Sequence, residues 1–225
     1  MSQATQFITQ AELPTTYGEF IIHVFEHHGQ EHLVLSQGDF SSDEAVLTRV
    51  HSECLTGDGL FSLRCDCGPQ LAYAMEQIAQ AKKGMIIYLR QEGRGIGLTE
   101  KIKAYQLQDQ GMDTFDANVK LGHPPDNRSY DMLADVFKHM GVSQVKLMTN
   151  NPDKIKSIES QGVKVVDRIP IKVGQNTHNQ NYLQTKQDKF LHLDWTSHPS
   201  EFLSLDMDLI FKDRFEWPDI SIVSC

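Results

Sequence analysis

One short apolar run constrains the fold of this chain more than any other segment. Residues 85–89 read Met-Ile-Ile-Tyr-Leu, which is typical of a buried strand. A helical pattern over 69–84 precedes this run, and a glycine-rich loop at 93–97 leads from it into a second helical pattern over 98–110. Strands that alternate with helices in this way predict an α/β domain.

The other predicted elements continue the alternation. We expect strands at 19–25, 32–35 and 45–50, a helix at 129–140, and a strand, turn, helix and strand within 144–166. Together these elements predict a layered α/β/α domain with a mixed, largely parallel central sheet. The composition changes after Trp195, so we expect a main domain over residues 1–195 and a C-terminal extension of unassigned role over residues 196–225.

Charge and composition exclude several kinds of protein. The net charge of −9 argues against a general nucleic-acid or membrane-surface binder, because such binding needs clustered cations over a broad face. It is compatible with one phosphorylated small molecule in a local basic pocket. The first residues lack a basic and apolar leader, and no apolar run approaches the ~18–20 residues that span a bilayer. We therefore expect a cytoplasmic protein without a membrane partner.

Three of the four cysteines lie within 14 positions, at Cys54, Cys65 and Cys67. In a reducing cytosol such clustering favours a metal over a disulfide, and thiolate ligands favour zinc. Three ligands leave a coordination position for water, as in catalytic zinc sites. The alternatives are a closed structural site that His51 completes, and unrelated buried thiols that bind no metal. The helix that begins just after Cys67 is expected to lower the pKa of that thiol.

The glycine-rich loop at residues 93–97 is a candidate anion site. It joins a buried strand to a helix, where backbone N–H groups and the helix N-terminus favour a phosphate. The alternative is a tight turn without a ligand. Five arginines near the motifs favour bidentate phosphate recognition if they converge in space: Arg49, Arg64, Arg90, Arg94 and Arg128.

These motifs resemble the signatures of the GTP cyclohydrolase II family. The resemblance extends over roughly residues 10–195 and rests on segments that occur in order along the chain: 49–58, 65–68, 91–98, Tyr105, 109–111, 126–128 and 147–152. It implies a hydrolase that acts on a cyclic amidine C–N bond. The family converts GTP and water into formate, pyrophosphate and a diamino-ribosylamino-pyrimidinone phosphate, the first step of riboflavin biosynthesis.

The resemblance also implies cofactors, an assembly and site residues. Zn²⁺, one per chain, would be held by Cys54, Cys65 and Cys67, Mg²⁺ would accompany the triphosphate, and the protein would be a homodimer. The GTP contacts carried over are Arg49, Val50, His51, Ser52, Glu53, Gln70, Glu92, Gly93, Arg94, Thr114, Thr149 and Lys154.

Three further residues are implied as catalytic. Asp126 is the family's proton acceptor, Arg128 its nucleophile toward the α-phosphorus, and Tyr105 a further position near the chemistry. A guanidinium is a poor nucleophile, so Arg128 has an alternative role as an electrostatic clamp. Tyr105 has an alternative as a core residue on a helix face shared with Lys101 and Gln108.

Two other functions remain open at this point. One is a relative that opens the purine ring but retains the formamide. The other is a nucleotide-binding paralogue that has lost turnover, against which the intact cysteine triplet and the Asp126–Arg128 pair argue.

Overall fold

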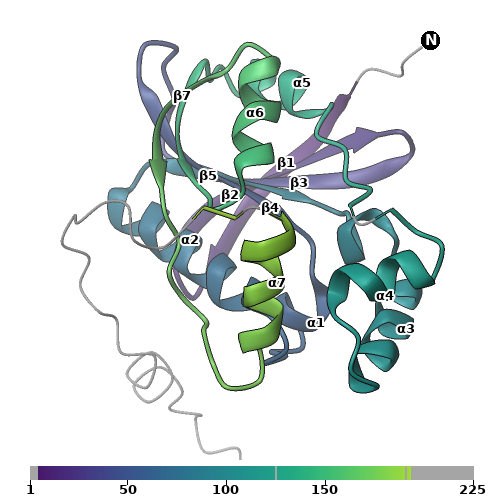
Figure 1. The fold of residues 1–225 in the computed structure, drawn as a ribbon. Coiled ribbons are helices and arrows are strands. Elements are labelled where there is room, and N and C mark those ends of the chain that lie inside the picture. The colour runs from purple at the N-terminus through teal and green to yellow at the C-terminus, as the bar shows by residue number, and fades with distance from the viewer. Residues whose placement is uncertain (1–4, 125, 191, 194–225) are drawn as a thin grey trace, which may run out of the picture. The chain divides into compact units, whose positions relative to one another are not determined.

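The computed structural model describes residues 5–124, 126–190 and 192–193. Within them, seven strands form one sheet in the order β1-β2-β3-β5-β4-β6-β7 (Figure 1). The strands are β1 (Gln6–Thr15), β2 (Gly18–His27), β3 (Gln30–Gln37), β4 (Ala45–Ser52), β5 (Gly84–Leu89), β6 (Gln144–Met148) and β7 (Lys164–Ile169). The predicted extension, 196–225, lies outside the described residues.

The sheet has a parallel part and an antiparallel part. Strands β5, β4, β6 and β7 are parallel to one another, whereas β1, β2 and β3 form an antiparallel meander in which β3 pairs antiparallel with β5. The helical segments are α1 (Leu55–Asp58), α2 (Cys67–Ala81), η1 (Glu92–Gly95), α3 (Leu98–Asp109), α4 (Thr114–Lys120), α5 (Leu133–His139), α6 (Pro152–Ser160) and α7 (Gln180–Phe190). The predicted α/β class with a mixed, largely parallel central sheet is confirmed.

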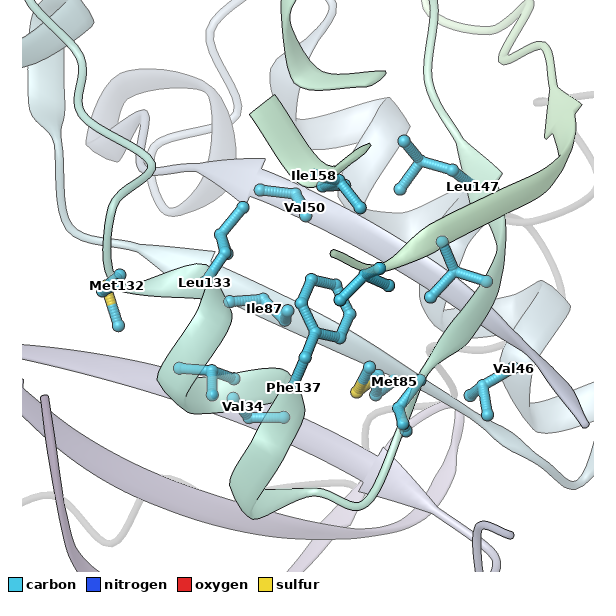
Figure 2. Packing of buried hydrophobic residues seen from close by; sticks show 14 of the residues in the cluster. Val34, Val46, Val50, Met85, Ile87, Met132, Leu133, Phe137, Leu147 and Ile158 are labelled. Carbon is cyan, nitrogen blue, oxygen red and sulfur yellow. The ribbon is translucent and has the colours of Figure 1, made fainter. Parts of the chain in front are cut away.

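Strand β5 is buried on both faces, as its apolar run predicts. Met85 and Ile87 point into a cluster that Phe137 of α5 and Ile158 of α6 complete, and Figure 2 shows Phe137 at its centre. Ile86 points the opposite way, toward α2. Helices therefore cover both faces of the sheet, and each large side chain buried there contributes roughly 1.5–3 kcal/mol.

Several elements differ from the prediction. Strand β1 was not expected, because most of its side chains are exposed and give no apolar pattern. The helix expected over residues 129–140 is shorter and begins only at Leu133. Helices α4 and α7 were also not expected. None of the helices in the described part of the chain has both the length and the apolarity to span a bilayer.

The parallel strands place the predicted motifs at one edge of the sheet. Strands β4, β5 and β6 run in the same direction, so their carboxyl ends lie together. The segments that follow these ends begin at Glu53, Arg90 and Thr149. In open α/β sheets ligands bind beyond the carboxyl ends of the strands. The site is therefore expected at this edge.

Candidate functional site

The three clustered cysteines converge in space. The Sγ atoms of Cys54, Cys65 and Cys67 all lie within 4.8 Å of one another, and those of Cys54 and Cys65 are 3.6 Å apart. Zn–S bonds of ~2.3 Å in a tetrahedron separate sulfurs by roughly 3.8 Å, so one zinc ion fits these donors. Among the described residues, no other group of His, Cys, Asp or Glu side chains is spaced for a metal ion.

Two glycines allow this convergence. A Cβ on Gly57 would lie 2.9 Å from the Cys65 Sγ and 3.2 Å from the Cys54 Sγ. A Cβ on Gly68 would lie 2.2 Å from the Gly57 carbonyl oxygen. The distances of 2.9 and 2.2 Å are shorter than real Cβ contacts, and 3.2 Å is tighter than most of them. The segments that carry the cysteines pack this closely because both positions lack a side chain.

His51 is not placed as a fourth ligand. Its Nε2 lies 3.1 Å from both carboxylate oxygens of Asp58. Asp58 also accepts hydrogen bonds from the Cys54 backbone N–H, at 3.0 Å, and from the Tyr88 hydroxyl, at 2.9 Å. The His51 imidazole thus belongs to a buried network that holds the Cys54 segment. His51 therefore does not complete the group of three cysteines, which line a pocket, and three protein ligands are the number typical of catalytic zinc sites.

Other groups outweigh the effect that helix α2 was expected to have on the pKa of Cys67. The pKa of the Cys67 thiol is raised, because the neighbouring thiols of Cys54 and Cys65 and burial all disfavour its charged form. The nearest cation approaches Cys54 instead. The Lys101 ammonium lies 3.1 Å from the Cys54 Sγ, a contact that sequence reasoning missed because a lysine on a helix usually faces solvent.

The cysteines adjoin a pocket that gathers residues from segments far apart in the sequence. The predicted site residues that line it are Arg49, His51, Ser52, Glu53, Cys54, Cys65, Cys67, Gln70, Glu92, Gly93, Arg94, Tyr105, Thr114, Arg128, Thr149 and Lys154. Two predicted residues do not line it. Val50 is only 1% exposed and packs in the core, with its carbonyl accepting a hydrogen bond from the Lys154 ammonium at 2.7 Å. Asp126 lies against Arg128.

Buried cations concentrate in this pocket. Arg49 donates to the Met148 carbonyl at 2.9 Å and to the Gln70 side chain at 2.6 Å, and burial lowers its pKa to about 10. Burial, with repulsion from Arg49 and Arg128, lowers the pKa of Lys154 well below its usual range. Within the described structure, the buried Arg49 Nε and Arg94 Nη1 have no hydrogen-bond acceptor. Such a pocket attracts a polyanion.

Three of the five predicted arginines converge on the pocket: Arg49, Arg94 and Arg128. Arg64 is paired with Asp109, and Arg90 lines a neighbouring hollow.

Arg128 and Asp126 form a two-pronged ion pair. Arg128 Nε donates to both Asp126 carboxylate oxygens, at 2.9 and 3.1 Å, and its Nη2 donates to one of them. Burial opposes the charge on Arg128, but Tyr130 and the bonded Asp126 outweigh it and raise the pKa of the guanidinium. The Arg128 side chain is therefore a fixed cation at the pocket.

Tyr105 faces the pocket near the cysteines. Its hydroxyl lies 3.4 Å from the Thr56 hydroxyl, which is 3.6 Å from the Cys54 Sγ. Burial raises the pKa of Tyr105. The predicted shared face is confirmed, since Lys101 and Gln108 line the same pocket. Tyr105 therefore lies at the pocket beside the cysteines with a protonated hydroxyl, rather than only in the core.

The glycine-rich loop has two parts. Gly93 and Arg94 line the pocket, and both have left-handed backbone, with φ of 62° and 61°. At Gly95 a Cβ would lie 2.6 Å from the Asn127 carbonyl oxygen, and the Asn127 N–H donates to the Arg94 carbonyl at 3.0 Å. The absent side chain at Gly95 thus lets the segment that carries Asp126 and Arg128 pack against the loop.

Helix α7 adds pocket residues that the sequence did not indicate. Tyr182, Lys186 and His192, from α7 and the segment after it, line the pocket. The Lys186 ammonium donates to Asp66 at 2.5 Å, which joins α7 to the turn between Cys65 and Cys67. This helix is polar and lacks a strong apolar face, so neither its position nor its role was predictable.

The fold and the site define a class of protein: an α/β protein in which three clustered cysteines could hold a metal ion at the edge of a cation-rich pocket. Comparison with known proteins narrows this class. The chain belongs to the GTP cyclohydrolase II family, whose model matches residues 6–170.

Several proteins named GTP cyclohydrolase-2 are similar to this chain. One from Neisseria meningitidis serogroup A is 54% identical over 194 residues, which cover 86% of this chain and 98% of the relative. One from Shewanella amazonensis is 54% identical over 190 residues, with 84% and 93% covered. A solved structure of a two-domain 3,4-dihydroxy-2-butanone 4-phosphate synthase from A. baumannii aligns with a TM-score of 0.39 and 18% identity, over 76% of this chain and 41% of that chain.

Proposed function

We propose that this chain is a zinc-dependent GTP cyclohydrolase II that hydrolyses GTP to formate, pyrophosphate and a diamino-ribosylamino-pyrimidinone phosphate, the first step of riboflavin biosynthesis. The observation that carries the proposal is the convergence of Cys54, Cys65 and Cys67 beside a pocket of buried cations. The family and its relatives support the same reaction. We further propose a cytoplasmic homodimer in which residues 1–195 form the catalytic domain.

Zinc would be held by the three cysteines, one ion per chain, beside the pocket that they line. A zinc ion there would supply Lewis acidity toward water at the purine ring. Mg²⁺ would enter with the triphosphate.

The phosphate end of GTP is assigned to the cations. Arg49, Arg94 and Lys154 are buried or half-buried in the pocket, where few water molecules screen their charge. The other proposed contacts come from residues around them: Val50, His51, Ser52, Glu53, Gln70, Glu92, Gly93, Thr114 and Thr149. Val50 would act through its backbone, since its side chain packs in the core.

Arg128 is assigned as an electrostatic clamp. A nucleophilic guanidine must first lose a proton, and the raised pKa of Arg128 opposes that loss. The paired Asp126 fixes the direction of the cation through its Nε and Nη2 atoms. Charge stabilisation during the loss of pyrophosphate requires such a fixed cation.

Tyr105 and Glu53 are assigned to proton transfer. Burial raises the pKa of both side chains, so the Tyr105 hydroxyl holds its proton for donation and the Glu53 carboxylate becomes a better base. Both line the pocket beside Cys54.

One assay separates the possible activities. Purified protein is incubated with GTP, Zn²⁺ and Mg²⁺, and formate and pyrophosphate are measured together. Equal amounts of the two products support the proposal. Pyrophosphate without formate would indicate an enzyme that retains the formamide, and neither product would indicate a binding protein. A Cys54→Ser variant that kept zinc and full formate release would contradict the assigned metal centre.

A further inference from the structure

Lys101 occupies an unusual position for a lysine. It is only 9% exposed, and its ammonium nitrogen has three close partners: the Cys54 Sγ at 3.1 Å, the Thr56 hydroxyl at 2.9 Å and a Glu92 carboxylate oxygen at 2.7 Å. An ammonium group has three N–H donors, so these contacts use all of them. Lys101 is thus fully committed within the site and has no donor left for a substrate phosphate.

The charge of the proposed metal centre explains why a cation next to the Cys54 sulfur would be favourable. Three thiolates exceed the charge of one divalent ion by one negative charge, and a buried charge is costly unless it is paired. Thiolates also donate electron density to a metal and weaken it as a Lewis acid. A hydrogen bond from a cation to one sulfur reduces that donation and offsets the excess charge.

We propose that Lys101 is a positioning residue of the metal centre, which orients the Cys54 thiolate and offsets its charge. This inference rests on the proposed role of Cys54, Cys65 and Cys67 as zinc ligands. The proposal explains why the Lys101 ammonium contacts the Cys54 sulfur. If Lys101 served only to stabilise the packing of the helix, its ion pair with Glu92 would be sufficient.

Glu92 extends the connection to the substrate side of the pocket. One of its carboxylate oxygens accepts from Lys101 and from the Gly93 N–H, at 2.8 Å, and the other accepts from the Leu55 N–H at 2.6 Å. Leu55 follows Cys54 directly. Lys101 and Glu92 therefore join the metal-ligand segment to the glycine-rich loop, so that displacing either residue changes both.

The test compares Lys101→Met and Lys101→Arg with a matched control, Lys103→Met, on the same helix. Lys103 is 54% exposed and pairs with Glu100, outside the pocket. Zinc affinity is measured by competition with a chromophoric chelator, and the thiolate-to-cobalt charge-transfer band is recorded on Co²⁺-loaded protein. Loss of an outer partner of a metal ligand typically costs about 10–100-fold in metal affinity. We expect that loss and a shifted band in Lys101→Met, a smaller change in Lys101→Arg, and none in Lys103→Met.

The outcomes separate this proposal from the assigned reaction. Wild-type zinc affinity and an unmoved cobalt band in Lys101→Met would overturn the role of Lys101, whether or not formate is released. Wild-type protein that binds zinc but releases no formate would overturn the reaction alone. Wild-type protein without zinc would overturn both. If Lys101→Met does not fold, zinc affinity and the cobalt band are measured on Lys101→Arg, which keeps the positive charge.

Discussion

Gly57 shows how one absent side chain shapes the proposed metal centre. A methyl group there would approach two cysteine sulfurs to 2.9 and 3.2 Å. We predict that Gly57→Ala separates the sulfurs and lowers zinc affinity at least 10-fold, measured by chelator competition. Gly59→Ala is the control, because a Cβ there meets its nearest atom at 3.4 Å. Equal zinc affinity in both variants would contradict the claim that a side chain at position 57 displaces the cysteine sulfurs.

The lowered pKa of Lys154 predicts a pH dependence of substrate binding. A bound triphosphate would relieve the repulsion from Arg49 and Arg128 and raise this pKa again. A group whose pKa rises on binding takes up a proton, so affinity falls as pH rises from the lowered pKa of the free protein to the raised pKa of the complex. Calorimetry of a non-hydrolysable GTP analogue, in buffers of different ionisation enthalpy, measures the uptake.

Two variants isolate the contribution of Lys154. Lys154→Met is expected to remove most of the proton uptake and to weaken binding. Lys156→Met on the same helix leaves both unchanged, since Lys156 is 78% exposed. If the Lys154→Met protein still takes up a proton when it binds the analogue, a group other than Lys154 is the one that is protonated.

The clamp role of Arg128 predicts that no covalent intermediate forms on it. Arg128→Ala is expected to slow pyrophosphate release by roughly 10³-fold or more, the scale seen for arginines that stabilise phosphoryl transfer. Lys156→Ala, which removes an exposed cation outside the pocket, should not slow it. Mass spectrometry of quenched turnover mixtures provides the decisive measurement. A phosphorylated peptide that contains Arg128 would establish nucleophilic attack instead.

At the scale of elements, the glycine-rich loop and the segment at residues 126–128 act as a unit. A Cβ on Gly95 would lie 2.6 Å from the Asn127 carbonyl oxygen and displace this segment. Misplacement by ~1 Å near a reacting group can cost 10²-fold in rate. We predict that Gly95→Ala lowers kcat at least 10-fold. Gly162→Ala shares a positive φ but meets no neighbour within 4 Å, so it should lower only thermal stability. Equal kcat in the two variants would rule out the packing role.

Element patterns predicted the centre of the fold better than its edges. Strand β5 and helix α2 were predictable because burial leaves an apolar run and an apolar stripe in the sequence. Strand β1, at the sheet edge, and helix α7, over the pocket, carry mostly polar side chains. Their places depend on neighbours distant in the sequence.

The same distinction applies to the site. The cysteines were predictable because their chemistry is rare and their spacing is short. The Lys101 contact with Cys54 joins residues 47 positions apart, and the His51 contact with Asp58 depends on how the chain turns after β4. Neither contact has a local sequence signal.

At the scale of the whole molecule, the metal centre and the core are separate. The two apolar clusters that hold the helices on the sheet contain none of the three cysteines. The fold therefore has its own source of stability. We predict that chelation leaves the far-UV circular dichroism native, in contrast to small structural zinc domains that unfold without metal.

Bound zinc still stabilises the folded state by mass action. At a free concentration a thousandfold above Kd the stabilisation is about 4 kcal/mol, equivalent to roughly 8–16 °C in Tm for a protein of this size. Scanning calorimetry with and without chelator measures the shift, and zinc added back should reverse it. Unfolding on chelation at 25 °C would mean that the cysteines hold the fold together. The group of three cysteines would then need an explanation other than catalysis, because a structural zinc ion is normally enclosed by four protein ligands.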